Sequence, residues 1–169
     1  FPQYASTTSG AVIEKVLTHL KNWTTIPNIR LINEFCDHED FINCHINRLN
    51  QYRPTEKLLI SFHSLPERQL KKAHACCLQE NCCNELRQCY KAHCIRTFNA
   101  ISQKCPNHDT ILTFQSRFGK EPWIGPETIE VAIQLAKDGV KSLTILSPSF
   151  VTDCIETVYE LGVEVKEAF

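Results

Sequence analysis

The chain has 169 residues, of which 43% are hydrophobic and 22% are charged, and its formal net charge is −1. This length and composition are typical of one globular domain with a sizeable core. The lysines and arginines are scattered and form no basic stripe, which argues against a nucleic-acid partner, and no apolar run is long enough to span a bilayer.

Four short apolar runs predict buried parallel strands, at residues 29–32, 57–62, 110–114 and 142–146. Helical patterns alternate with these runs. They cover residues 8–20, 37–49, 85–101 and 126–137, and a further helix begins near Asp153. The alternation predicts an α/β fold, a three-layer Rossmann-like domain with a mainly parallel four-stranded sheet.

Polar residues follow several of the predicted strands directly. His63 comes after the second strand, Gln115 and Ser116 come after the third, and the loop 148–153 comes after the fourth. Ligands of such sheets bind at the carboxyl ends of the strands. We therefore expect these residues to share one edge of the sheet.

His63 is the first candidate for chemistry. A neutral imidazole at a strand end can bind a metal ion or accept a proton near neutral pH. Pro66 keeps Leu65 extended and so directs the following loop away from the sheet. The alternative is that His63 merely bonds to a loop carbonyl.

Glu156 is the second candidate, in the first turn of the helix that begins near Asp153. Asp153 and Glu156 also fit a capping box, which is the structural alternative. Glu160 and Glu164 follow at four-residue steps, so the three carboxylates share one helix face. Such a row suits proton transfer or cation passage, and the alternative is a solvated acidic face.

Trp123 lies in a stiff loop between Pro122 and Gly125-Pro126. A large aromatic side chain held in this way can form a stacking wall for a flat ligand. The alternative is a tryptophan that plugs the edge of the sheet.

Ten cysteines occur in the chain, and six of them lie between residues 76 and 94. Four thiolates can hold a [2Fe–2S] cluster or a zinc ion. The preferred ligands are Cys77, Cys89 and Cys94 with either Cys82 or Cys83, and the remaining cysteines are interpreted as small buried hydrophobic residues. In a secreted chain the same cysteines would indicate disulfides, and that alternative stays open.

Together these motifs resemble the ferrochelatase family. The resemblance rests on four segments and their order, at residues 1–10, 61–68, 114–119 and 153–157. It implies a lyase that inserts Fe²⁺ into protoporphyrin IX, the final step of haem synthesis, with release of two protons. It also implies two Rossmann-like halves, of which this chain is similar to the second.

The resemblance assigns a role to each candidate residue. It implies that His63 is the metal ligand or proton acceptor and that Glu156 is the acidic partner on the opposite face of the macrocycle. The implied substrate-binding residues are Tyr4, Ser64, Gln115, Ser116 and Trp123. Glu160 and Glu164 are similar to the carboxylate row of the family. The cysteine-rich segment is similar to the internal [2Fe–2S] segment of some bacterial ferrochelatases.

The expected organisation follows from the same resemblance. Residues 1–28 form a crossing segment, and residues 29–169 form the second Rossmann-like domain with a cysteine-rich insertion at about 74–95. Because the first residues read as the interior of a longer protein, the expected partner is the missing N-terminal half. We expect a cytoplasmic enzyme, and peripheral contact with a membrane stays open.

Three other functions are consistent with the sequence. The first is a related chelatase that acts on coproporphyrin or inserts cobalt. The second is an iron–sulfur redox or sensing module without chelatase activity. The third is a binding domain stapled by disulfides.

Overall fold

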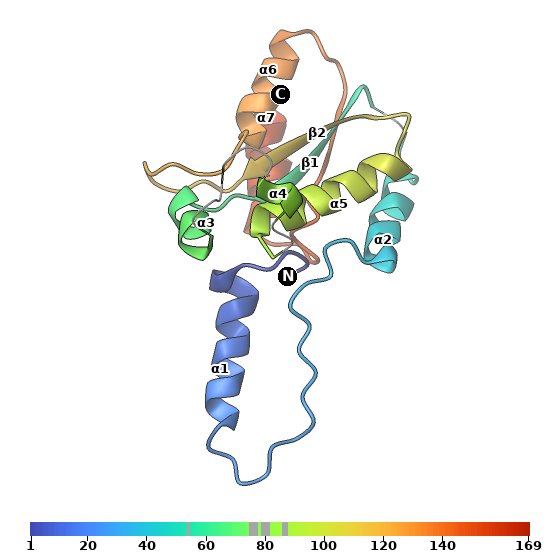
Figure 1. Ribbon diagram of the computed structural model, residues 1–169. Coiled ribbons are helices and arrows are strands. Elements are labelled where there is room, and N and C mark those ends of the chain that lie inside the picture. The colour runs from blue at the N-terminus through green and yellow to red at the C-terminus, as the bar shows by residue number, and fades with distance from the viewer. Residues whose placement is uncertain (54, 75–77, 79–81, 86–87) are drawn as a thin grey trace.

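A parallel sheet forms the centre of the computed structural model, which describes residues 1–53, 55–74, 78, 82–85 and 88–169 (Figure 1). Within these ranges the sheet has three strands in the order β2-β1-β3. They are β1 (Lys57–His63), β2 (Asp109–Gln115) and β3 (Leu143–Leu146). The predicted α/β fold with a parallel sheet is confirmed, whereas the prediction of four strands is wrong.

The central strand β1 is covered on both faces because its side chains alternate between them. Leu58, Ile60 and Phe62 face one side and belong to the main apolar cluster of the domain. Ser61 points to the other side. All four side chains are fully buried, which explains why the sequence of β1 reads as an apolar run.

Helices cover both faces of the sheet. The helices α2 (Glu39–Leu49) and α5 (Tyr90–Lys104) lie on the side of the apolar cluster, to which both contribute side chains. On the other side α6 (Thr128–Lys137) packs against β2 and against η2 (Glu156–Val165), which leads into α7 (Lys166–Ala168). Among the helices of the described ranges, none has the length and apolar character needed to cross a membrane.

The N-terminal region forms an arm that extends away from this body (Figure 1). It consists of η1 (Ser6–Gly10), α1 (Ala11–Leu20) and an extended return segment. No side chain of α1 is buried. The strand predicted at 29–32 lies in the return segment and pairs with no described strand, so that prediction is wrong. An apolar run does not become a strand unless a neighbouring strand takes its backbone hydrogen bonds.

Helices α2, α5 and α6 and the segment η2 begin two to five residues later than the sequence pattern indicated. Helix α5 begins at Tyr90 because Cys89 is still extended, with φ −116° and ψ 137°. Helix α6 begins at Thr128 because Glu127 is still extended, with φ −77° and ψ 135°. Two short helices, α3 (Glu67–Ala73) and α4 (Cys82–Glu85), were not predicted.

Candidate active site

His63 is the last residue of β1, and its backbone is held from two sides. Its N–H donates to Ser149 Oγ at 3.3 Å, and its carbonyl oxygen accepts from the Tyr90 hydroxyl at 2.6 Å. The ring Nδ1 lies 2.5 Å from the carbonyl oxygen of Ser64. Because a carbonyl oxygen can only accept, Nδ1 carries the proton and Nε2 of the neutral ring has the free lone pair. The half-buried ring can therefore accept a proton or bind a metal ion through Nε2.

Glu156 is the first residue of the π-helical segment η2, and its side chain is half-buried. The pKa of this carboxyl is lowered by a hydrogen bond with the Cys154 side chain, by its own backbone N–H and by the positive charge that His63 carries when it is protonated, which together outweigh the effect of burial. Glu156 is therefore an anion at neutral pH, and its interaction with His63 places the two side chains in one electrostatic neighbourhood.

His63 and Glu156 line the same two adjoining hollows at the carboxyl edge of the sheet. One hollow has a volume of about 350 Å³ and is also lined by Gln3, Ser149 and Phe150. The other has a volume of about 600 Å³ and extends along η2 towards Glu164. The structure thus brings together the imidazole and the carboxylate that the sequence singled out, in a space of the size that small ligands occupy.

Ser64 and Gln115 support these two residues from behind. Both are buried, and Ser64 N–H donates to the Gln115 carbonyl oxygen at 2.7 Å. The Ser64 hydroxyl donates to the Ile124 carbonyl oxygen at 2.7 Å, and Gln115 Nε2 donates to the Glu156 carbonyl oxygen at 3.0 Å. Their polar groups connect the ends of β1 and β2 to the start of η2, and neither side chain lines a hollow with His63.

Glu160 is held by the turn after β2. Ser116 adopts a positive φ of 66°, a conformation that is uncommon for a serine. Both the N–H and the hydroxyl of Ser116 donate to the Glu160 carboxylate at 2.6 Å. Glu164 is exposed on the same face of η2 and lines the larger hollow with Glu156 and Glu160. The three carboxylates share a face as expected, but Glu160 is bound to the backbone of a neighbouring loop.

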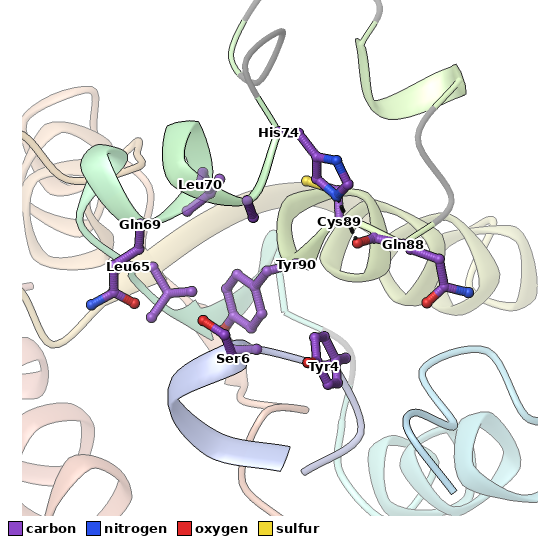
Figure 2. Close-up of a pocket in the computed structure, with 11 residues that line it drawn as sticks. Tyr4, Ser6, Leu65, Gln69, Leu70, His74, Gln88, Cys89 and Tyr90 are labelled. Carbon is purple, nitrogen blue, oxygen red and sulfur yellow. Dashed lines mark hydrogen bonds between the residues drawn. The ribbon is translucent and has the colours of Figure 1, made fainter. Parts of the chain in front are cut away.

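Trp123 and Tyr4 lie outside the two hollows. Trp123 is half-buried, forms a backbone bridge with Pro66, and has a buried indole Nε1 with no hydrogen-bond partner in the described structure. Tyr4 lines a smaller neighbouring cavity of about 50 Å³ with Leu65 and Tyr90 (Figure 2).

The cysteine-rich segment lies beside the start of α5. Cys77 falls outside the described residues, whereas Cys82, Cys83, Cys89 and Cys94 are described. The Sγ atoms of Cys82 and Cys83 lie 3.9 Å apart, and burial together with Cys82 raises the pKa of Cys83 to about 12. Burial also raises the pKa of Cys94, and the neighbouring Cys89 and Cys83 raise it further. The Cys82 and Cys89 thiols thus lie near Cys83, and the Cys83 and Cys89 thiols lie near Cys94.

A buried polar chain, which the sequence did not reveal, leads away from His63. Ser149 accepts from His63 N–H and donates to Gln3 Oε1 at 3.2 Å. Gln3 Nε2 donates to Thr97 Oγ1 at 3.0 Å, and Thr97 donates to the Cys36 carbonyl oxygen at 2.5 Å. The chain joins residues up to 146 positions apart, so no local sequence pattern could have indicated it.

Comparisons with known proteins agree on one family. The sequence profile of the Ferrochelatase family matches residues 1–169. The ferrochelatase of Legionella pneumophila strain Philadelphia 1 is 36% identical over 99% of this chain and 53% of that protein. The ferrochelatase of Bdellovibrio bacteriovorus is 34% identical, over 100% of this chain and 53% of that protein.

A relative named for a different substrate is nearly as similar. The coproporphyrin III ferrochelatase of Symbiobacterium thermophilum is 33% identical over 100% of this chain and 50% of that protein. The chain spans about half the length of these curated relatives.

Proposed function

The chain belongs to the ferrochelatase family, and from this premise we propose that it supplies catalytic residues for the insertion of Fe²⁺ into protoporphyrin IX. The observation that carries the proposal is the pairing of His63 and Glu156 in one hollow at the sheet edge. A free imidazole lone pair and an ionised carboxylate are the groups that metal insertion into a porphyrin requires.

The proposed reaction replaces two pyrrole protons by one metal ion. Free-base porphyrin and Fe²⁺ give the iron porphyrin and two protons, and the iron keeps its oxidation state. His63 Nε2 accepts one proton or holds the entering Fe²⁺, because Nδ1–H is committed to Ser64. Glu156 attracts the cation and accepts the second proton, which can then pass to water. Two fixed acceptors lower the barrier by general base catalysis.

Supporting residues set the positions of these two groups. We propose that Ser64, Gln115 and Ser116 act by fixing the ends of the strands and the start of η2. Glu164 offers an exposed carboxylate at the mouth of the larger hollow, so it suits the entry of Fe²⁺ or the exit of protons. Glu160, which is bound to Ser116, orients this part of η2 in the proposed path.

We retain Tyr4 and Trp123 as proposed cleft-wall residues. Neither lines the hollows that contain His63. Phe150 has better support as an aromatic wall, because its ring centroid lies 6.0 Å from that of His63 and it lines the smaller hollow.

We propose a [2Fe–2S] cluster on the cysteine-rich side, with a zinc ion as the alternative occupant. Cys82, Cys83, Cys89 and Cys94 would hold it, since thiolates suit either group. Cys77 is a further proposed ligand from the sequence. Such a cluster would supply one-electron chemistry or a structural clamp, and no step of metal insertion passes through it. An absorption spectrum of anaerobically purified protein, before and after a chelator, tests this proposal.

The remaining part of the enzyme is the proposed partner. Exposed apolar side chains occur along the arm, such as Val12 at 59% and Ile32 at 67% exposure. We propose that they pack against the N-terminal half of the same enzyme, which would complete the porphyrin cleft. We place the enzyme in the cytoplasm because the clustered thiols suit a reducing compartment, and we assign it no nucleic-acid partner.

A coproporphyrin chelatase is the second candidate, favoured by the similarity to the coproporphyrin III ferrochelatase of Symbiobacterium thermophilum. Rates of Fe²⁺ and Co²⁺ insertion into protoporphyrin IX and into coproporphyrin III, measured with the full-length enzyme, separate the candidates. A kcat/KM at least about tenfold higher for protoporphyrin IX with Fe²⁺ supports the primary proposal. The reverse preference would assign the second, and no insertion of either metal would remove both.

A further inference from the structure

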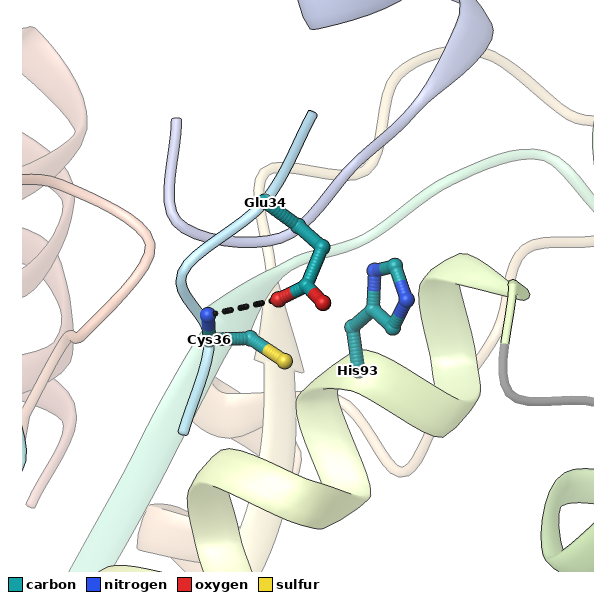
Figure 3. Close-up of side chains that lie close together, drawn as sticks. All are labelled: Glu34, Cys36 and His93. Carbon is teal, nitrogen blue, oxygen red and sulfur yellow. Dashed lines mark hydrogen bonds between the residues drawn. The ribbon is translucent and has the colours of Figure 1, made fainter. Parts of the chain in front are cut away.

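Glu34, Cys36 and His93 form a group of potential metal ligands apart from the hollows that contain His63. Glu34 and Cys36 lie on the segment that enters α2, and His93 lies in the first turn of α5 (Figure 3). One ligand atom from each residue lies within 4.8 Å of the others. In the part of the chain that the structure describes, this is the one group of three or more such side chains that converges so closely.

The group has a buried base and one open side. Cys36 and His93 are both 0% exposed, so their side chains are held in place by packing. The Glu34 side chain is 20% exposed and lines a surface hollow with Phe35 and Asp37. An ion can therefore approach past the carboxylate and reach a thiol and an imidazole that are already positioned.

We propose that Glu34, Cys36 and His93 bind one divalent transition-metal ion of borderline softness, such as Zn²⁺, Co²⁺ or Fe²⁺. One sulfur, one nitrogen and one oxygen ligand favour these ions over Mg²⁺ and Ca²⁺, which prefer oxygen ligands. Three protein ligands leave the fourth tetrahedral position for water, as in open zinc sites. The three ligands line neither hollow that contains His63, and none of them belongs to the proposed cysteine cluster.

Existing contacts orient the Glu34 carboxylate. Cys36 N–H donates to Glu34 Oε2 at 3.0 Å, and Arg96 Nη1 lies 3.7 Å from Glu34 Oε1. A carboxylate has about four lone-pair positions, so these two contacts leave capacity for a metal bond. Arg96 Nη2 lies closer to Asp37 Oδ2, at 2.7 Å, so the positive charge of Arg96 is shared between Asp37 and Glu34.

Metal binding would change one hydrogen bond of the N-terminal segment. Tyr4 N–H donates to His93 Nδ1 at 3.1 Å. A neutral imidazole has a single nitrogen lone pair available in the ring plane. An ion bound to either ring nitrogen uses that lone pair and leaves the proton on the other nitrogen, so the Tyr4 N–H loses its acceptor.

The loss of this hydrogen bond would connect the proposed metal site to the hollow at His63. Tyr4 lies between Gln3 and Ala5, which both line the smaller hollow. Gln3 also takes part in the buried chain that runs from Cys36 through Thr97 to Ser149. A metal ion at Glu34, Cys36 and His93 would therefore act on the wall of the active-site hollow through residues 3–5.

Titration of the full-length protein with Co²⁺ under anaerobic conditions tests the site. Tetrahedral Co²⁺ gives visible d–d bands, and a thiolate ligand adds a charge-transfer band in the near ultraviolet. We expect Cys36→Ser to remove one equivalent of bound Co²⁺ and its share of the charge-transfer band. Cys44→Ser is the matched control, since Cys44 is an exposed free thiol on α2, and it should bind as the wild type does.

A second variant keeps the test decisive if Cys36→Ser does not fold. Glu34→Gln changes a partly exposed side chain and should weaken Co²⁺ binding about 10- to 100-fold. Unchanged Co²⁺ stoichiometry in a folded Cys36→Ser protein, unchanged affinity in Glu34→Gln, or an equal loss in Cys44→Ser would overturn the proposal.

Hydrogen exchange tests the connection to the N-terminal segment without measuring activity. Bound Co²⁺ should speed exchange of the Tyr4 amide in the wild type and leave it unchanged in Glu34→Gln at the same Co²⁺ concentration. A Tyr4 amide that stays equally protected when the ion is bound would show that the lone pair of His93 is not used.

Discussion

Two groups of potential metal ligands differ in how far they are open to solvent. His63 and Glu156 at the sheet edge are half-buried, line shared hollows and are held mostly through backbone groups. Cys36 of the Glu34 group and Cys94 of α5, a proposed cluster ligand, are fully buried, and burial raises the pKa of both thiols. A group that exchanges protons with a substrate must stay accessible, whereas a buried thiol remains protonated and inert until a metal ion displaces its proton. The difference in solvent exposure therefore distinguishes the proposed catalytic residues at the sheet edge from the buried thiols that are proposed to hold resident metal ions.

Removal of the His63 side chain should have the largest effect on activity. We expect His63→Ala in the full-length enzyme to lower kcat for Fe²⁺ insertion about 10³-fold, in the range for loss of a general base. His38→Ala is the control, because the exposed His38 side chain lines neither hollow that contains His63. Activity within about twofold of the wild type would remove His63 from the mechanism.

Neutralisation of Glu156 should have the next largest effect. Glu156→Gln should lower kcat about 10²-fold while porphyrin binding, measured by fluorescence quenching, persists. If Glu156 only caps η2, the variant would instead lose thermal stability and keep its rate per folded molecule. Comparison of kcat with Tm therefore separates the catalytic from the structural role.

The Glu156→Gln variant should also differ from the wild type in how its Tm depends on pH. The folded-state pKa of Glu156 is lowered from 4.5, mainly by the Cys154 side chain, so the ionised form stabilises the fold. That contribution is fully present above the unfolded value and is lost as the pH falls through the lower folded value. The difference in Tm between wild type and Glu156→Gln should stay constant from pH 6 to 8 and shrink only below pH 4.5. A difference that instead changes between pH 6 and 8 would indicate another titrating group.

Glu160 should matter more for stability than Glu164, four residues later on the same face. Glu160→Ala leaves Ser116 N–H without its acceptor in a strained turn, which should cost about 2 kcal/mol. The resulting fall in Tm is about 4–8 °C for a chain of this size, measured by circular dichroism. Glu164→Ala changes an exposed side chain and should alter stability by less than about 0.5 kcal/mol. Equal effects would mean that the contact with Ser116 is unimportant.

The arm should show the smallest effect on the stability of this chain. Val16 and Leu17 of α1 are 43% and 42% exposed, so Val16→Ala and Leu17→Ala should change unfolding of the 169-residue chain by less than about 0.5 kcal/mol. The same changes should destabilise the full-length enzyme if the arm packs against its other half. Equal Tm shifts in both proteins would contradict that packing.

The sequence predicted the sheet edge well because its signals are local. The apolar run before His63 is β1, and the polar residues after β1 and β2 share one edge because parallel strands end together. The run 29–32 was predicted wrongly because its apolar residues lie in the extended return segment, where no described strand pairs with them. The π-helical form of η2 could not be predicted, since a local apolar pattern does not distinguish a π-helix from an α-helix.

The group of Glu34, Cys36 and His93 could not be foreseen for a different reason. Glu34 and Cys36 lie on a loop and His93 on α5, more than 50 positions later in the sequence. The sequence predicts Cys36 as a small buried hydrophobic residue. Its 0% exposure confirms that it is buried, but the prediction did not include a role as a ligand. The convergence of the three ligands becomes visible once the fold brings the two segments together.

A double-mutant cycle in the full-length enzyme tests the central claim most directly, namely that His63 and Glu156 act on one porphyrin in one hollow. The rate of Fe²⁺ insertion is measured for wild type, His63→Ala, Glu156→Gln and the double variant. Residues that act as a unit are strongly non-additive, so the double variant should be within about threefold of His63→Ala. A double variant slowed by the full product of the two single effects, with porphyrin still bound, would show that the two residues act independently and contradict the shared site.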